Sequence, residues 1–267
     1  MLAISTFNPP NIGFFGRPLS MYKNMLPDSF PLNPQDSLLV VPGGPSPILD
    51  DLISECLYKS NIKLVDIMYG STEEDLRELT IQWRNQYFTK DCVNFDRMLK
   101  QFIDIDLNDD ELRIVGENIL SKNNEEYTKV LLEETDKFYD EYRRYPKNFL
   151  KGDIRNLDFL HRTFDKIWVT NLLHLYKKDL TEDFHYDAYN SLVTRLNISG
   201  SIYVYPIDKE DKEFLSERLI PRLKKQYAGR FGFQLMNSNT ESVVNEGLLP
   251  IMPNRPRTQY LKITRRF

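Results

Sequence analysis

A short buried strand followed by a turn rich in proline and glycine constrains the fold of this chain more than any other segment. Residues 37–41, Ser-Leu-Leu-Val-Val, form the continuous apolar run that a parallel strand covered on both faces requires. Residues 42–47, Pro-Gly-Gly-Pro-Ser-Pro, end this run, and apolar positions at helical spacing follow over 48–58. A second apolar strand, 62–66, comes a few residues later. This order predicts a parallel βαβ unit and therefore an α/β fold.

The rest of the chain continues this alternation after one long interruption. Residues 72–147 are highly charged and show repeated helical periodicity, which predicts a helical insertion of about four helices. Frequent prolines before the first strand forbid a long helix there, so residues 1–36 are expected to form an arm laid over a single domain of residues 37–267. Strands are expected at 148–153, 164–170 and 201–205, helices at 186–193 and 209–227, and a closing antiparallel hairpin at 231–236 and 259–264.

Composition limits the compartment and the partners. The formal net charge of -4 gives no global attraction for phosphate backbones, so nucleic acid is not favoured as a partner, although this net charge leaves room for a local basic patch. The two cysteines are too few for a disulfide framework, and no apolar stretch approaches the length that spans a bilayer. We expect a soluble cytoplasmic protein without a cleaved signal, a metal site or a membrane partner. The sequence leaves its oligomeric state open.

Three stretches at predicted strand ends resemble those of class I S-adenosylmethionine-dependent methyltransferases. They are residues 65–67, Val-Asp-Ile, residues 152–154, Gly-Asp-Ile, and residues 164–174, which begin with Phe-Asp-Lys-Ile-Trp. The resemblance covers residues 37–267 apart from the insertion. It implies a Rossmann-like seven-stranded, mostly parallel sheet with an antiparallel last strand, helices on both faces and a helical insertion.

The resemblance also implies a binding site at the carboxyl ends of the strands. In the family, an acidic residue after the second strand accepts hydrogen bonds from the ribose hydroxyls, and an Asp after the third strand contacts the adenine amino group. In open parallel sheets generally, ligands bind outside the carboxyl ends of the strands, which is the edge where these residues are expected. The residues expected to contact S-adenosylmethionine are Gly43, Gly44, Ser46, Asp66, Ile67, Asp153, Ile154, Thr170 and Asn171.

The first turn departs from the family pattern. The family has an acidic residue and three spaced glycines there, whereas this chain has Val41 at the acidic position and Pro45 and Pro47 at the later glycine positions. Prolines remove backbone N–H donors that could contact the cofactor. The carboxylate that assists the amino acid part of the cofactor is also missing.

Candidate catalytic residues follow the fourth strand. His174 could act as a general base near neutral pH, and Tyr176 lies two positions later. The alternative is that His174 lies half buried at the start of a helix, with catalysis coming mainly from positioning the two reactants.

The sequence therefore predicts transfer of a methyl group from S-adenosylmethionine to a small-molecule acceptor, with S-adenosylhomocysteine as the product. The degenerate first turn keeps a second hypothesis open, a methyltransferase-like binding or interaction protein without turnover. A dinucleotide enzyme of the general Rossmann type ranks last, because its third glycine is missing.

Overall fold

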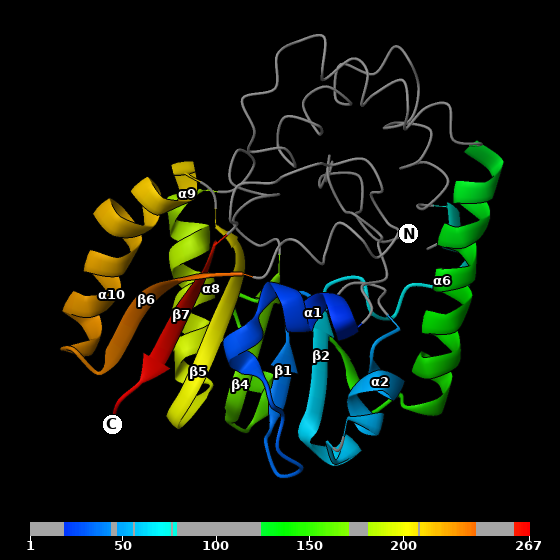
Figure 1. Ribbon diagram of the computed structural model, residues 1–267, viewed down its shortest axis with the longest axis horizontal. Coiled ribbons are helices and arrows are strands. Elements are labelled where there is room, and N and C mark those ends of the chain that lie inside the picture. Colours follow the sequence, from blue (N-terminus) through cyan, green and yellow to red (C-terminus); the bar gives the residue numbers. More distant parts are fainter. Residues whose placement is uncertain are drawn as a thin grey trace, which may run out of the picture.

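A seven-stranded sheet forms the centre of the molecule (Figure 1). The computed structural model describes residues 19–43, 47–55, 57–75, 77–78, 124–170, 181–207, 209–238 and 259–267. The strand order is β3-β2-β1-β4-β5-β7-β6. The strands are β1 (Leu38–Val40), β2 (Ile62–Asp66), β3 (Phe149–Lys151), β4 (Phe164–Thr170), β5 (Leu196–Ile207), β6 (Phe231–Asn237) and β7 (Gln259–Arg265).

Only β7 opposes the direction of the other strands of this sheet. Strands β1 to β5 pair in parallel, whereas β7 pairs antiparallel with both β5 and β6. This arrangement confirms the predicted fold class: a Rossmann-like, mostly parallel sheet closed by an antiparallel last strand. The closing hairpin of β6 and β7 is confirmed as well.

Helices cover both faces of the sheet. One face carries α1 (Leu19–Met25), α2 (Leu49–Ser54) and α6 (Asn124–Arg144). The other carries α8 (Glu182–Thr194), α9 (Lys209–Phe214), the π-helical η5 (Leu215–Leu219) and α10 (Ile220–Tyr227). Three short 3-10 turns, η2 (Pro27–Ser29), η3 (Lys59–Asn61) and η4 (Asp158–Leu160), complete the described elements.

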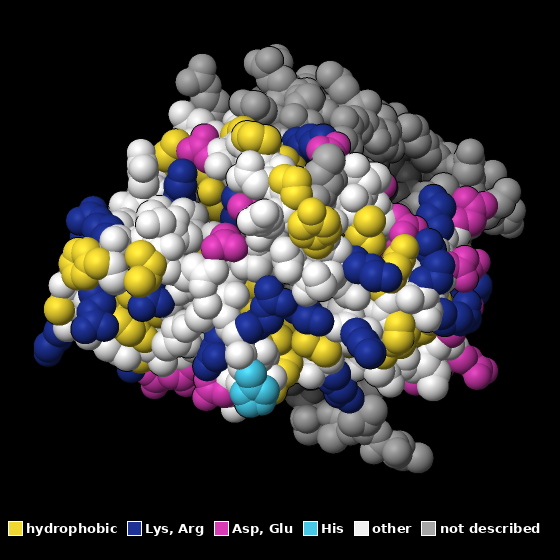
Figure 2. All heavy atoms as spheres, turned by 90° about the horizontal axis from the view of Figure 1, so that it is seen from below, with side chains coloured by type: hydrophobic (Ala, Val, Ile, Leu, Met, Phe, Trp, Pro, Cys, Tyr) yellow, Lys and Arg dark blue, Asp and Glu magenta, His cyan; other side chains and the backbone are white. Residues whose placement is uncertain are grey.

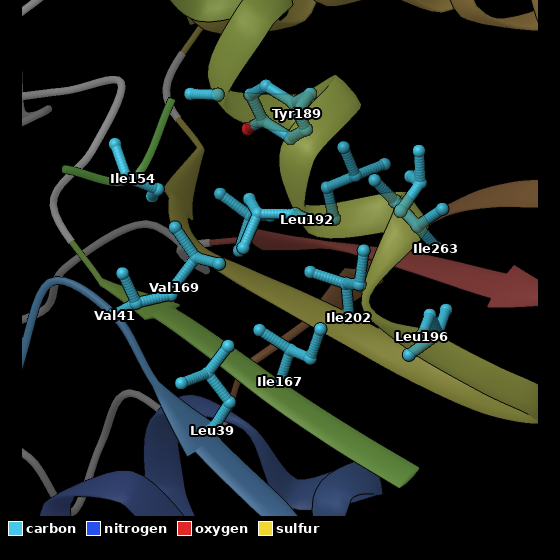
Figure 3. Close-up of a cluster of buried hydrophobic side chains, with 14 of the residues drawn as sticks. Leu39, Val41, Ile154, Ile167, Val169, Tyr189, Leu192, Leu196, Ile202 and Ile263 are labelled. Atoms are coloured by element: carbon cyan, nitrogen blue, oxygen red, sulfur yellow. The ribbon is translucent and has the colours of Figure 1, made fainter. Parts of the chain in front are cut away.

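Successive side chains of each strand point to opposite faces of the sheet, so the buried side chains form two cores. Leu38 and Val40 of β1 belong to the core under α1, α2 and α6, while Leu39 belongs to the core under α8 and α10. Figure 3 shows the second core, in which Ile167 and Val169 lie near Leu39 and face α8. The continuous apolar runs in the sequence thus reflect burial on both faces.

Element boundaries differ from the predictions by a few residues at several ends, and two differences stand out. The helix expected over 48–58 ends at Ser54. The strand expected over 201–205 begins earlier, at Leu196, and runs through Gly200. A Cβ on Gly200 would lie 2.9 Å from the carbonyl oxygen of Asp165, so only glycine fits this close approach beside the irregular register of β4 and β5.

Helix α6 is the crossover between β2 and β3. Its Phe138 packs edge-on against Phe149 of β3, with ring centroids 5.5 Å apart. At least the end of the stretch predicted as an insertion over 72–147 is therefore the ordinary connection of a βαβ unit. Residues 79–123 lie outside the described part of the chain, and the division into arm, domain and insertion stays a prediction.

The described part of the arm lies over the sheet. Tyr22 of α1 stacks on Trp168 of β4 with ring centroids 4.9 Å apart, and Phe30 lies 5.4 Å from the same indole. The ammonium of Lys166 donates hydrogen bonds to the carbonyl oxygens of Ser29 and Pro31. The arm thus supplies the cover that α2 and α6 do not provide over β4. None of the described helices is both long and apolar enough to cross a membrane.

Glu141 of α6 joins this helix to the start of α2. Its two carboxylate oxygens accept hydrogen bonds from the backbone N–H groups of Leu49 and Asp50, each at 3.0 Å. The first N–H groups of a helix have no partner inside the helix, so this distant carboxylate satisfies two of them. Glu141 is buried, and burial raises its pKa to about 7 although the two N–H groups act in the opposite direction.

The raised pKa of Glu141 predicts a pH dependence of folding stability. Between the ordinary glutamate pKa and about 7, the folded state holds a proton that the unfolded state has lost, so stability falls as the pH rises through this window. We expect the free energy of unfolding to fall by roughly 1 to 3 kcal/mol between pH 5 and pH 8 in the wild type, and by much less in Glu141→Gln. Urea denaturation across this range measures the difference, and equal pH slopes for the two proteins would contradict it.

Candidate functional site

The carboxyl ends of β1, β2 and β3 bring three of the predicted site residues to one edge of the sheet, at the top of Figure 1. The backbone N–H of Gly43, after β1, donates to the carbonyl oxygen of Val65 at 2.9 Å. The N–H of Gly152, after β3, donates to the carbonyl oxygen of Asp66 at 3.1 Å. Adjacent parallel strands therefore hold the three turns together, with Gly43, Asp66 and Asp153 at their starts.

Gly43 is a glycine because a tyrosine packs against it. A Cβ at this position would lie 2.2 Å from the hydroxyl oxygen of Tyr69 and 3.3 Å from the Cβ of Leu64. Tyr69 follows β2 and is buried, with its ring stacked on Phe138 of α6. Burial, followed by the charge of Asp66, raises the pKa of the Tyr69 hydroxyl well above its usual range. The predicted role of Gly43 in cofactor contact stays a prediction, whereas its contact with Tyr69 is structural.

Asp66 is the last residue of β2 and is nearly buried. Its Oδ1 accepts a hydrogen bond from the backbone N–H of Met68 at 2.9 Å, which fixes the carboxylate at the start of the turn. Ile67, the next residue, is 50% exposed, so half of its aliphatic side chain is accessible at this edge. A buried acid beside an exposed apolar side chain suits a ligand with both a diol and a flat apolar ring.

Asp153 lies after β3 and forms an ion pair with Arg155. The guanidinium Nε lies 3.1 and 3.0 Å from the two carboxylate oxygens, and the backbone N–H of Arg155 donates to Oδ1 at 2.9 Å. Burial alone would raise the pKa of Asp153, but the hydrogen bonds and charge of Arg155 lower it on balance. The guanidinium also lies 4.9 Å from the centroid of the Phe184 ring on α8.

Two further predicted residues are buried. Ile154 belongs to the core under α8, where Figure 3 shows it near Val41 and Val169. Thr170, the last residue of β4, is 5% exposed and pairs with Tyr205 of β5. Both lie at the expected edge, but their side chains are largely covered by protein.

The remaining site predictions lie outside the described residues. They are the cofactor contacts Gly44, Ser46 and Asn171 and the catalytic candidates His174 and Tyr176. Among the residues that the structure describes, no group of His, Cys, Asp and Glu side chains is arranged to hold a metal ion.

Sequence reasoning missed three residues that shape this edge: Tyr69, Glu141 and Arg155. Arg155 follows Asp153 by two positions, so an Asx-type turn with a neighbouring cation was a readable signal. Tyr69 and Glu141 act on residues of other elements, and no local pattern marks such contacts.

The contact between Gly43 and Tyr69 predicts an energetic coupling. We expect Gly43→Ala to destabilise the protein by about 1 to 3 kcal/mol, because the new methyl group must displace a buried hydroxyl. The same substitution should cost less in a Tyr69→Phe background, because the nearest remaining ring atom, Cζ, is 3.2 Å from the ideal Cβ. A double-mutant cycle by urea denaturation measures the coupling, and strictly additive costs would refute the contact.

Comparison with known proteins gives fold neighbours at low sequence identity. No family model matches the sequence, and no curated protein does either. A solved structure of an rRNA methylase from Clostridium thermocellum is 14% identical, with a TM-score of 0.32, and the match covers 50% of this chain and 65% of that one. TrmN from Thermus thermophilus is 13% identical, with a TM-score of 0.36, over 87% of this chain and 45% of that one.

A third neighbour matches over its whole length. The plantazolicin methyltransferase BpumL, solved with a desmethylPZN analogue and S-adenosylhomocysteine, is 13% identical with a TM-score of 0.32, over 73% of this chain and 100% of that one. The present chain matches less than two thirds of the rRNA methylase and less than half of TrmN.

These neighbours correct one expectation. Nucleic acid was not favoured as a partner on the ground of net charge, but the neighbours include rRNA methylases from Clostridium thermocellum and Streptococcus thermophilus. Net charge is a sum over the whole surface and does not report a local cluster of cations, so the expectation that disfavoured nucleic acid is wrong. The strand order and the single reversed strand of this chain are those that the resemblance to class I methyltransferases predicts.

Proposed function

We propose that this protein binds S-adenosylmethionine at the carboxyl ends of β1, β2 and β3 and transfers its methyl group to an acceptor. The observation that carries the proposal is the placement of Asp66, a nearly buried carboxylate at the end of β2, directly beside the turn after β3. In an open parallel sheet, ligands bind outside the carboxyl ends of the strands where the strand order reverses, and here that point is β1.

Asp66 would hold the ribose. A carboxylate offers about four acceptor positions, so an Asp66 side chain oriented by the backbone N–H of Met68 and by its other contacts can include hydroxyl groups among its donors. Hydrogen bonds to a charged group contribute roughly 1.5 to 3 kcal/mol each. Because Asp66 is buried, little water competes for its oxygens, which strengthens these bonds.

Ile67 and Asp153 would hold the adenine. The exposed aliphatic side chain of Ile67 offers a flat ring an apolar surface, and Asp153 offers a carboxylate whose position Arg155 fixes. The lowered pKa of Asp153 keeps it ionised and able to accept a hydrogen bond from an amino group. Ile154 would support the site from within the core.

Bound S-adenosylmethionine would supply a sulfonium methyl group that a nucleophile of the acceptor can attack in line. The contribution of the protein is then to orient the two reactants, which can lower the barrier without a strong base. Thr170 closes β4 at the same edge, and the stretch that follows it contains the catalytic candidates His174 and Tyr176. A small molecule is the acceptor that we propose first, with nucleic acid as the alternative.

The packing of Tyr69 on Gly43 favours a second candidate function. This contact fills the space beside the first glycine with a side chain of the protein itself, and Val41 replaces the usual acid. A methyltransferase-like binding protein without turnover would have both features. The two candidate functions differ in whether the methyl group of the bound cofactor is transferred to an acceptor.

Calorimetric titration with S-adenosylhomocysteine tests the binding. We expect saturable binding by the wild type and at least tenfold weaker binding by Asp66→Asn, which keeps the side-chain acceptor for Met68 but loses the charge. Asp183→Asn, on the exposed start of α8, is the matched control and should bind like the wild type. A well-folded wild-type protein that releases no heat would refute the proposal.

Methyl transfer and its acceptor are tested with S-adenosylmethionine labelled in the methyl group. We expect label to move into the small-molecule fraction of a cell extract and to be lost with Asp66→Asn. Label in the RNA fraction would replace the small-molecule acceptor with a nucleic acid. Binding without transfer to either fraction would support the second candidate instead.

A further inference from the structure

A cluster of cations surrounds the turn η3, at the amino ends of the strands. It consists of Lys59 in η3, Lys63 in β2, Lys147 before β3 and Arg162 before β4, and we call it the η3 basic cluster. These residues come from three separate stretches of the sequence, and the parallel sheet brings their elements together at its lower edge in Figure 1. Viewed from below, this edge shows Lys and Arg side chains gathered near its centre (Figure 2).

Hydrogen bonds to backbone carbonyl groups hold the cluster together. The ammonium of Lys63 donates to the carbonyl oxygen of Lys147 at 2.6 Å. The guanidinium of Arg162 donates to the carbonyl oxygen of Ser60 at 3.0 Å. Asn148, next to Lys147, donates from its side-chain amide to the carbonyl oxygens of Lys59 and Ile62. The backbone positions of the four cations are therefore fixed relative to one another.

The charges of the cluster are not neutralised within the part of the chain that the structure describes. No described carboxylate lies within ion-pair distance of any of the four cations, whereas nearby Arg144, Lys166 and Arg195 each pair with an aspartate. Burial, and then repulsion from Arg162 and Lys147, lowers the pKa of Lys63. The charge of Arg162 also attracts the carboxylate of Asp165. Hydrogen bonds from Ser37 and Asn197 already occupy the oxygens of that carboxylate.

Aromatic rings lie among the cations. Tyr58 directly precedes Lys59 and is 59% exposed, so most of its ring is accessible. The ammonium of Lys59 lies 6.0 Å from the centroid of the Tyr145 ring, and Arg144 lies 5.3 Å from the same centroid. Cations that can follow a phosphate backbone, interspersed with exposed rings on which bases can stack, are the combination that binds single-stranded nucleic acid.

We propose that the η3 basic cluster and Tyr58 form a docking surface for single-stranded nucleic acid. The four cations would contact phosphates, and the exposed ring of Tyr58 would stack on a base. This surface lies at the opposite end of the strands from the candidate cofactor site, because Lys59 precedes β2 whereas Asp66 ends it. Nucleic acid held here would be bound away from the site of methyl transfer, so the proposal goes beyond the proposed function and does not require it.

Fluorescence anisotropy with a labelled 12-nucleotide single-stranded RNA, without any cofactor, tests the docking surface. We expect saturable binding that weakens with salt, with a slope of log K against log salt of about -2 to -3 for four phosphate contacts. Lys59→Glu with Lys147→Glu reverses two exposed charges and should weaken binding at least tenfold. Tyr58→Ala should weaken it about 5- to 100-fold through loss of stacking.

The matched control reverses two exposed lysines on α10, Lys224→Glu with Lys225→Glu, and so changes the net charge by the same amount. It should bind RNA nearly as well as the wild type, and circular dichroism should show all variants folded. Failure of the wild type to bind, or equal loss in the control and the cluster variant, would overturn the proposal. Binding to phosphatidylserine vesicles but not to the RNA would overturn it in favour of a lipid surface.

Discussion

The pairing of β1 with β2 on one side and β4 on the other is the constraint on which the rest of the structure depends. β1 has only three residues, yet Leu38, Leu39 and Val40 are completely buried, so this short strand contributes to both cores. The order of the strands reverses at this point, since β2 and β3 extend to one side and β4 and β5 to the other. The position of β1 therefore sets the positions of the turns at the carboxyl edge, including those that start at Gly43 and Asp66.

The two faces of the sheet stabilise the candidate site in different ways. On the face under α6, aromatic side chains of α6 and β3 enclose Tyr69, which in turn fixes the backbone at Gly43. On the face under α8, Arg155 connects the turn after β3 to the ring of Phe184. Asp66, the last residue of β2, thus lies between two rigid supports, as a site that works by positioning requires.

Much of the fold could be predicted from the sequence because its signals are local. Runs such as that of residues 37–41 report burial on both faces, and the end of β2 with its acid could be read directly. Tyr69 and Glu141 could not be predicted, because each acts on an element distant in the sequence and no local pattern records that contact. The net charge failed for a related reason, since a sum over all residues hides a cluster such as that around η3.

The hydrogen bonds from α2 to Glu141 link two helices that are distant in the sequence. They join residues 92 and 91 positions apart. Such bonds form only when both helices have packed against the sheet, because the entropy cost of bringing distant segments together must be met first. If α6 left the sheet, the first backbone N–H groups of α2 would lose these acceptors, so we expect the two helices to unfold together.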